Sequence, residues 1–301
     1  MSGVVKQFPV EKEYEKNPDI SPEDILKLRE WLKTQPHLPG DYLDELDLII
    51  SYHCCERSAE VSKQVIDLHY TLRTLFPFFK DRCYDMKIEF TMNTVLIAPL
   101  PTPTVHGYRA IYARLLDADP RHFNFVDAVR TFMMIFDLWQ YEEGTWPGFV
   151  LIIDMDTAVV AHLARVELMA LRQVLYFLQE VMLVKLKGVH FLNAPGFMDK
   201  LLLMLRPFLK KDLLDMLYIH QRDSSSTYDH IPKKAFPKNC GGEYKDFETI
   251  KEELIVRLQS NPTFFRDENR RRVNETLRKG KKATVEDLFG IQGSFKKLDI
   301  D

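Results

Sequence analysis

The sequence predicts an α/β protein in which a small helical module precedes a mostly parallel sheet flanked by helices. Two observations carry this prediction. Short apolar or β-branched runs, typical of strands, occur at residues 110–116, 149–153, 188–192 and 216–219. Long helical patterns occur at residues 125–141, 159–180 and 197–211. Strands that alternate with long helices favour a parallel sheet with crossover connections.

The N-terminal part is predicted to begin loosely and then to form helices. Residues 1–20 are polar and charged, and we expect them to be loosely ordered. Ser21 and Pro22 mark a helix start, because a serine side chain caps free N–H groups and proline suits the first turn. Apolar residues at helical spacing mark further helices over 43–50 and 61–72. We therefore assign residues 21–85 to an N-terminal helical module.

Two more segments complete the predicted organisation. Residues 86–245 hold the predicted strands and form the main domain, and residues 246–301 form a C-terminal helix and a basic tail. The tail carries eight basic residues against three acids over 266–282. It fits an anionic membrane surface or a strap across the acidic body of the protein. Leu288, Phe289 and Phe295, which look like packing anchors, favour the strap.

The most informative stretch is the helix predicted after the strand at 188–192. Nine of the thirteen residues from 197 to 209 are Phe, Leu or Met, which is more than an ordinary surface helix carries. Such a helix covers something apolar on one side and is able to meet something apolar on the other. This predicts a lid over the binding site of a water-insoluble molecule. The alternative is an ordinary core helix rich in leucine.

No combination of residues indicates an enzyme, a metal site or a cofactor. The sequence lacks a nucleophile elbow, a dinucleotide-binding glycine motif, a P-loop and a zinc-protease motif. Asp154 and Asp156 end a predicted strand, where α/β enzymes often keep catalytic acids. We interpret them instead as residues that solvate the strand end and cap the next helix. The chain is therefore predicted to be neither an enzyme nor a cofactor-binding protein.

Composition indicates the cellular compartment of the protein and the kinds of partner that it binds. The net charge of −3 gives no global attraction to nucleic acid. The first residues lack the apolar run of a secretory signal, and no apolar run is long enough for a transmembrane helix. Four scattered cysteines fit a reducing compartment better than a disulfide framework. We expect a cytoplasmic monomer with peripheral, transient contact with membranes.

Five motifs in the right order resemble the CRAL-TRIO family of lipid carriers. Two of them, residues 28–38 and 70–77, resemble the start and end of its N-terminal helical module, and residues 187–195 resemble the strand and turn before its gate helix. Residues 236–242 resemble its Leu-Pro-x-Glu-Tyr-Gly-Gly signature with three substitutions, and residues 286–298 resemble the tail of its arthropod α-tocopherol-transfer-like branch. The resemblance implies a lipid-binding bowl closed by a mobile gate helix over one buried hydrophobic molecule, such as tocopherol, a retinoid, a carotenoid or another lipid.

The resemblance also implies which side chains line the pocket. Carried over position by position, the ligand-binding candidates are Thr131, Ile135, Phe149, Leu151, Ile153, Val174, Phe177, Leu178, Met182, Val184 and Val189. Thr131 offers a hydroxyl to a ligand head group, whereas Ile135 is apolar where the tocopherol carrier has a serine, which argues against tocopherol. The gate candidates, which share one helix face, are Phe197, Leu201 and Met204.

Phosphoinositide binding is the second property that the resemblance implies. Lys185 and Lys187 match two basic positions of the family, and they alternate around Leu186, so they share a side if the segment is extended. Along the gate, Asp212 and Met216 stand where two basic residues are expected. The nearby candidates to replace them are Arg206, Lys210 and Lys211. The alternative function is therefore a phosphoinositide-binding membrane-trafficking adaptor of the same fold.

Overall fold

The computed structural model describes residues 3–222 and 224–289, and it confirms the α/β class. The strands form a sheet of order β1-β2-β3-β4-β5 in which β1 is antiparallel to β2 and all the other neighbours are parallel. The strands are β1 (Val95–Pro99), β2 (Arg109–Leu115), β3 (Phe149–Asp154), β4 (Leu186–Leu192) and β5 (Leu217–Ile219). The four predicted strands are all present, and β1 is an addition that directly follows a helix without any turn residue between them.

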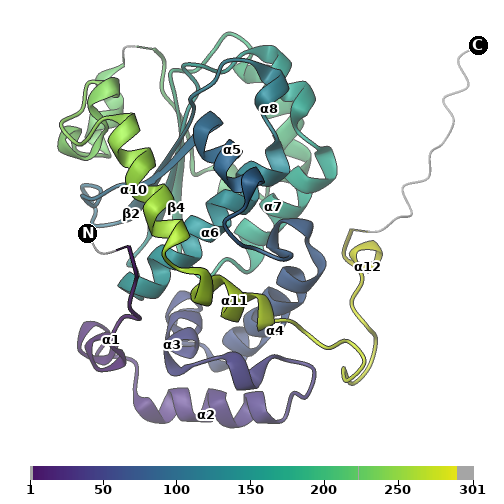
Figure 1. Ribbon diagram of the computed structural model, residues 1–301. Helices are drawn as coiled ribbons and strands as arrows, with labels where there is room; N and C mark the ends of the chain where they lie inside the picture. Colours follow the sequence, from purple (N-terminus) through teal and green to yellow (C-terminus); the bar gives the residue numbers. More distant parts are fainter. Residues whose placement is uncertain (1–2, 223, 290–301) are drawn as a thin grey trace, which may run out of the picture.

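Helices cover both faces of this sheet and form a separate group below it (Figure 1). The α-helices are α1 (Val10–Lys16), α2 (Pro22–Lys33), α3 (Glu45–Cys54), α4 (Ala59–Leu75), α5 (Met86–Thr94), α6 (Phe125–Glu143), α7 (Leu168–Glu180), α8 (Met198–Leu205), α9 (Lys211–Leu214), α10 (Phe247–Gln259), α11 (Pro262–Arg270) and α12 (Val285–Phe289). Short 3-10 helices used below are η2 (Pro77–Phe79), η4 (Val160–Arg165) and η5 (Arg206–Phe208).

Two predicted helices are broken into shorter pieces. The pattern at 159–180 divides into η4 and α7, because Val166 and Glu167 between them adopt extended backbone angles. The pattern at 197–211 divides into α8, η5 and the start of α9. Pro207 explains the second break, because proline lacks the N–H that would continue the helix.

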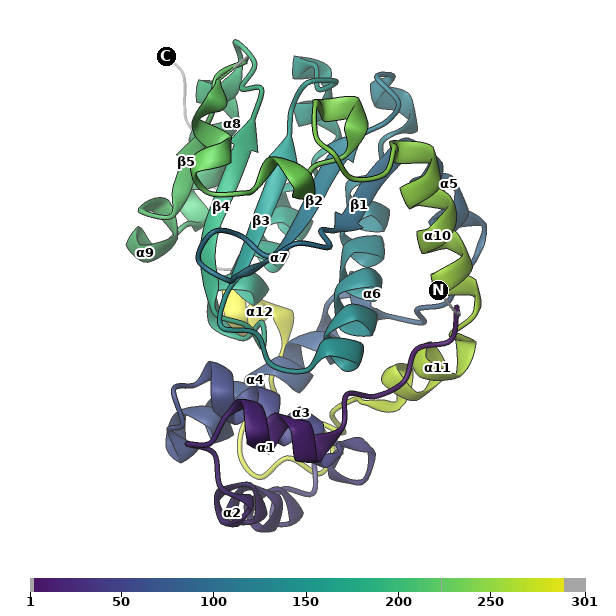
Figure 2. The same ribbon diagram turned by 90° about the vertical axis from the view of Figure 1, so that its left-hand side faces the viewer.

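The two faces of the sheet have different partners. On β3, Leu151 and Ile153 point to the side of α6, α7 and α8, whereas Val150 and Ile152 point to the other side, as the two-residue period of a strand requires. The second face is covered by α10 and by the segment after β5, as Figure 2 shows. There the ring of Tyr112 lies 6.2 Å from that of Phe236. Both faces of the central strands are therefore covered, as expected for parallel strands, whereas Tyr218 and Ile219 of the edge strand β5 are exposed.

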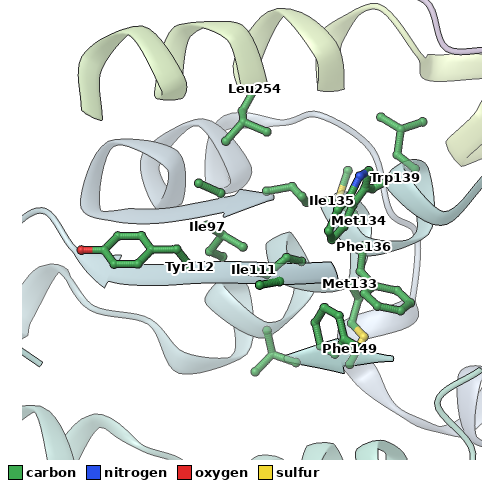
Figure 3. Close-up of a cluster of buried hydrophobic side chains, with 14 of the residues drawn as sticks. Ile97, Ile111, Tyr112, Met133, Met134, Ile135, Phe136, Trp139, Phe149 and Leu254 are labelled. Carbon is green, nitrogen blue, oxygen red and sulfur yellow. The ribbon is translucent and has the colours of Figure 1, made fainter. Parts of the chain in front are cut away.

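The hydrophobic core joins α6, the sheet and α10. Figure 3 shows Met133 and Phe136 of α6 close to Phe149 of β3, and Leu254 of α10 close to β1 and β2. The rings of Phe136 and Phe149 meet edge to face with centroids 5.4 Å apart, a favoured aromatic geometry. This packing fixes α6 against the sheet.

The N-terminal helices have a core of their own, built around Leu28, Ile49 and Ile66. The predicted helix start at Ser21 is present, and its side chain accepts from the Asp24 N–H at 3.2 Å. Asp44 caps α3 in the same way and forms a capping box with Asp47. These caps explain where α2 and α3 begin.

Residues 3–20 differ from the loosely ordered segment that the sequence predicted. They contain α1, and the carboxylate of Glu13 is fully buried. It accepts from the Thr145 N–H at 2.8 Å and from the Asn17 amide at 2.8 Å. The Phe8 N–H also donates to the Tyr141 carbonyl at 2.8 Å. The polar composition that suggested loose order therefore supplies hydrogen bonds to the loop after α6.

The C-terminal segment runs as a strap along the helical module. Arg271 pairs with Asp47 at 2.7 Å, and Arg278 pairs with Asp67 at 2.8 Å. Phe289 stacks on Phe76 with centroids 5.9 Å apart, so it is a packing anchor, as the sequence indicated. Phe295 and the rest of the tail motif from residue 290 onward lie outside the described residues. The strap interpretation of the basic stretch agrees with these contacts.

Candidate functional site

A cavity of about 320 Å³ lies between the sheet and α6, α7 and α8. Its floor is built by side chains of β1 to β5, and its walls by α6, α7, η4 and the segment of residues 197–214, which we call the α8 segment. Its volume lies at the lower end of the range for small-molecule sites. The lining residues include Val95, Ile97, Ala113, Leu115, Phe125, Phe132, Leu171, Leu175, Phe191, Leu205, Leu213 and Leu217.

The lining is apolar except at three residues: Arg114, Asp154 and His162. A buried water needs two to four polar partners, and the apolar side chains of the lining offer none. Water therefore gains little by entering, while an apolar molecule gains the transfer free energy of leaving water. The chemistry of the cavity suits a hydrophobic occupant.

The predicted gate residues lie along one wall of this cavity. Phe197, Leu201 and Met204 all line it, as their shared helix face predicted. On the opposite face of α8, Leu203 is 70% exposed. The α8 segment therefore has one apolar side toward the cavity, while its outer side carries a single exposed leucine among Asp199, Lys200 and Arg206.

Part of the predicted pocket lining also faces the cavity. Leu151 and Ile153 of β3 and Val189 of β4 reach it from the sheet, and Val174 and Leu178 reach it from α7. The strand residues follow the two-residue period and the helix residues are four apart, so the patterns placed each group on one face.

Three other predicted residues, two on α6 and one on β3, lie away from the cavity. The Thr131 hydroxyl is fully buried and donates to the Asp127 carbonyl of its own helix at 2.8 Å. Ile135 lines a separate groove beside α10. Phe149 is packed among aromatic rings at the start of β3 (Figure 3).

The last three predicted residues lie toward the helical module. Phe177 packs against Phe79 with ring centroids 4.8 Å apart, and together with Met182 it lines a small gap near α3 and α4. Val184 packs half-buried against the main core. Phe177 is one residue from Leu178, and a turn of about 100° per residue is enough to move it off the cavity face.

Sequence reasoning missed several lining residues. Ala128, Val129, Phe132 and Met133 of α6 line the cavity, although the residues expected there were Thr131 and Ile135. On β4, Phe191 follows Val189 by two residues, so continuing the strand period would have found it. The α6 residues have the right spacing, but the sequence alone does not say which face of that helix meets the cavity.

The polar end of the cavity is an ion-pair network at the carboxyl ends of the strands. Asp154 is 3% exposed, and it accepts from Arg114 at 2.9 Å and from the Asn193 amide at 2.8 Å. It also accepts a short hydrogen bond from the Tyr112 hydroxyl. Burial favours the neutral acid, but these donors together hold the pKa of Asp154 below its usual value. Asp154 is therefore a buried structural anion rather than the solvated strand end that the sequence suggested.

The predicted phosphoinositide residues are distributed over different surroundings. Lys185 pairs with Glu56 at 2.7 Å, and Lys210 pairs with Glu180. Lys187 lines a polar pocket of about 210 Å³, and Arg206 and Lys211 are exposed on the α8 segment. The lining of that pocket is Thr104, His106, Tyr108, Val150, Lys187, His190, Tyr218, His230 and Ile231.

An irregularity in β4 explains why Lys185 and Lys187 have different neighbours. Phe149 pairs with Leu186 but Val150 pairs with Gly188, so Lys187 is the extra residue between them. Such a bulge breaks the simple alternation that would put Lys185 and Lys187 on one side.

Over residues 3–222 and 224–289, no group of three or more His, Cys, Asp or Glu side chains is arranged to hold a metal ion. Within the same residues, every helix is too short or too polar to cross a bilayer.

Family comparisons match most of the described chain. A model of the CRAL/TRIO domain matches residues 93–242, and a model described as a Pinta-like UBA domain matches residues 17–87. The CRAL/TRIO match spans β1 to β5, α6 to α9 and every side chain named above as lining the cavity.

Individual relatives are distant. Human alpha-tocopherol transfer protein-like is 22% identical over 259 residues, which cover 86% of this chain and 69% of the relative. The mouse counterpart is 21% identical over 228 residues, which cover 75% of this chain and 61% of the relative, less than two thirds of its length. Clavesin-1 of Xenopus laevis is 22% identical over 239 residues, which cover 78% of this chain and 72% of the relative.

One solved structure, the crystal structure of Sfh5, aligns with a TM-score of 0.46 and 12% identity over 77% of this chain and 92% of that chain. The family match, by contrast, falls on the same residues that build the sheet, the α8 segment and the cavity between them. The chain contains a CRAL/TRIO domain and belongs to the CRAL-TRIO family.

Proposed function

We propose that this protein is a carrier that binds one hydrophobic molecule in the cavity and exchanges it at membranes. The observation that carries the proposal is the cavity itself, whose floor and walls are apolar apart from three side chains at one end. Two of the relatives are named for α-tocopherol transfer, and we extend transfer of a hydrophobic molecule to this chain. The class extends to retinoids, carotenoids and other lipids.

The energetics suit reversible transport. Burying roughly 400 Å² of apolar ligand surface at about 25 cal/mol/Å² gives on the order of 10 kcal/mol of gross stabilisation. Immobilising the ligand and ordering side chains consume part of this. The remainder is enough for tight binding in water, while a bilayer offers the ligand a competing apolar environment of similar quality.

The α8 segment is the route by which the ligand enters and leaves. Its inner face supplies cavity wall through Leu201 and Met204, and its outer face presents Leu203 and Arg206 to the surroundings. An exposed leucine beside basic residues suits the interface of an anionic membrane. Contact there replaces water on the outer face and favours an opened segment.

The first test identifies a passenger. The protein is purified from cells and analysed by native mass spectrometry, followed by organic extraction of the bound material. A stoichiometric apolar passenger is expected. The proposal fails if the cell-derived protein is empty and a panel of tocopherol, retinoid, sterol and phospholipid shows no binding.

A pair of matched variants ties binding to this cavity. Val189→Phe places extra volume inside the cavity, whereas Leu203→Phe places the same ring on the exposed face of α8. We expect at least a tenfold loss of ligand affinity for the first variant and unchanged affinity for the second. Equal affinities for both variants would locate binding elsewhere.

The second candidate function is a phosphoinositide-binding membrane-trafficking adaptor. The observation that favours it is Lys187, which lines a pocket with imidazole and phenol groups from three histidines and two tyrosines and with no carboxylate. In vesicle flotation, charge reversal of Lys187 is expected to reduce recruitment to phosphoinositide vesicles and to leave lipid uptake intact. The matched control is Lys185, which already pairs with Glu56. Unchanged recruitment of the Lys187 variant would remove this candidate.

A further inference from the structure

One side chain in the cavity wall has a polar atom without a partner. His162 of η4 lines the cavity and is 5% exposed. Its Nε2 atom is buried and makes no hydrogen bond. Among the described residues that line this cavity, no other side chain has a buried nitrogen or oxygen without a partner.

The other ring nitrogen fixes which proton His162 carries. Nδ1 lies 3.1 Å from the backbone nitrogen of Val159 and 3.2 Å from its carbonyl oxygen. The carbonyl already accepts from the His162 backbone N–H at 2.9 Å, whereas the Val159 N–H has no other acceptor among the described residues, so we assign Nδ1 as the acceptor of that hydrogen. Burial lowers the pKa of His162, so the ring is neutral at pH 7. A neutral imidazole that accepts at Nδ1 carries its proton on Nε2. Nε2 is therefore a hydrogen-bond donor, held on the ring edge away from the Val159 backbone.

The remaining polar groups of the cavity already have partners. Arg114 donates to Asp154 at 2.9 Å and to Asp156 at 2.8 Å, so its charge is matched by two carboxylates. Asp154 in turn accepts from Tyr112, Arg114 and Asn193. A charged ligand group would find no free counter-charge here. An uncharged oxygen needs only a donor, which the His162 Nε2–H supplies.

We propose that His162 is the polar recognition point of the cavity and that the cargo has one uncharged oxygen acceptor, a hydroxyl or a carbonyl, at one end of a hydrocarbon body. This inference rests on the proposed carrier function and narrows its cargo. The oxygen accepts from Nε2–H near the carboxyl ends of the strands, and the hydrocarbon lies toward Leu178 and Val189. Entry of the cargo displaces the apolar side chains that shield Nε2 in the closed structure.

The proposed recognition predicts that two ligands of the same shape bind with different affinity when only one of them carries an oxygen acceptor. A buried donor left without a partner is unfavourable, so a ligand that brings an acceptor gains over a ligand that does not. A site with an unpaired polar group therefore discriminates between an alcohol and its hydrocarbon more strongly than an apolar site does.

The test compares 1-dodecanol with dodecane, which share a chain and differ in one hydroxyl. Their affinities are measured by competition in native mass spectrometry for the wild type, for His162→Phe and for the control His122→Phe. His122 is an exposed histidine that pairs with Asp117 and does not line the cavity. We expect the alcohol-to-alkane affinity ratio to fall at least tenfold in His162→Phe and to stay unchanged in His122→Phe.

A second measurement on the wild type does not depend on any variant folding. In protein with ¹⁵N-labelled histidine, the Nε2–H resonance of His162 is expected to shift on addition of dodecanol and to stay in place with dodecane. If neither probe binds, the carrier function itself fails. If both probes bind but the resonance shifts equally, or if the ratio is the same in His162→Phe, the carrier function stands and the role of His162 is overturned.

Discussion

Asp154 is a residue whose role depends on neighbours that are distant in the sequence. Tyr112 and Arg114 come from β2 and Asn193 from the turn before α8, and all three donate to one carboxylate. Removing one partner of a buried ion pair leaves the other charge uncompensated in a poorly solvating interior. The side chain therefore matters for the free energy of unfolding.

We expect Asp154→Ala to lower the free energy of unfolding by about 3–5 kcal/mol, because Arg114 and Tyr112 lose their shared acceptor. Urea unfolding followed by circular dichroism measures the change. Asp156→Ala is the control, since its side chain is 33% exposed and its pairs are partly solvated. A loss below about 1 kcal/mol for Asp154→Ala, the size typical of an exposed pair, would contradict the buried-anion assignment.

Asp154 and a second buried carboxylate, Asp137 of α6, make stability depend on pH. Asp137 pairs with Arg73 and Arg82. The donors around both carboxylates outweigh burial and hold both pKa values below the usual range, whereas an unfolded aspartate has a pKa of about 3.9. Their contribution is complete above the unfolded pKa and is lost as the pH falls through the lowered folded values. We expect the free energy of unfolding to fall between about pH 4 and pH 2.

Urea unfolding at a series of pH values checks this direction. Burial raises the pKa of Asp47 to about 7, so this group opposes the trend until the unfolded aspartate, with a pKa of about 3.9, is also protonated. Below about pH 3 Asp47 is protonated in both states, and the slope there is expected to be shallower in Asp154→Asn. Stability that rises as the pH falls below about 3 would contradict the assignment.

At residue level the sequence predicted spacing better than orientation. Leu151, Ile153 and Val189 face the cavity as predicted. A strand side chain points to one of only two faces, so the alternation left little room for error. Thr131 and Ile135 were expected on the cavity face of α6, but Phe132 and Met133 stand there. A helix buried on several sides is apolar in several directions, so its periodicity does not say which side meets a cavity.

The turn before the α8 segment has an unusual backbone angle. Asn193 in this turn has a φ of 52°, in the left-handed region, and its amide donates to Asp154 at 2.8 Å. Asparagine tolerates this conformation better than most residues, and glycine adopts it freely. The turn therefore combines an unusual backbone angle with a tether to the sheet, and on the proposed function it is the hinge of the α8 segment.

Two substitutions separate these contributions. Asn193→Gly removes the tether and keeps the backbone angle, whereas Asn193→Ala removes the tether and also adds strain of about 1–2 kcal/mol. We expect both variants to release ligand to vesicles faster than the wild type, and the alanine variant to be less stable by that amount. Stopped-flow transfer and urea unfolding measure the two effects. Wild-type transfer rates in both variants would show that the tether does not restrain the segment.

The sequence also predicted helices and strands better than the breaks and bulges within them. The composition of residues 197–209 indicated an apolar helix, and Pro207 within it was the visible reason for a break that the prediction left out. For β4, the irregularity at Lys187 depends on pairing with β3. Pairing is a property of two strands, so neither strand alone contains it.

The whole molecule is held together by a buried group of four charges. Asp137 of α6 contacts Arg73 of α4 and Arg82 at 2.6 Å each, and Glu268 of α11 contacts the same two arginines at 2.6 and 3.4 Å. The N-terminal module, the main domain and the C-terminal strap thus share one network. We expect the parts to lose their structure together.

The expected outcome is a single unfolding transition for the full chain. Trp31 reports on the N-terminal helices, and Trp139 and Trp146 report on the main domain, so fluorescence of Trp31→Phe follows the main domain alone. Its midpoint in urea should coincide with the midpoint from far-ultraviolet circular dichroism. Glu268→Ala should move both midpoints together, with a loss of about 3–5 kcal/mol. Two separated transitions in the wild type would contradict the shared network.

At this scale the sequence predicted which layers exist but not how they are joined. The change from helical patterns to alternating strands and helices was visible along the chain. The long-range partners of Glu13 and Glu268 were not, because Thr145 lies 132 residues from Glu13 and Arg73 lies 195 residues from Glu268. Long-range polar contacts leave no periodic pattern by which a single sequence reveals them.

On the proposed carrier function, the apolar cavity links the amount of this protein in a cell to the supply of its ligand. An occupant that binds only the folded form adds RT ln(1 + [L]/Kd) to its stability, about 2.7 kcal/mol at a hundredfold excess over Kd. Empty molecules unfold more often and are cleared sooner by proteases. A shortage of ligand is then expected to lower the level of the protein, so that its abundance follows the supply of the ligand.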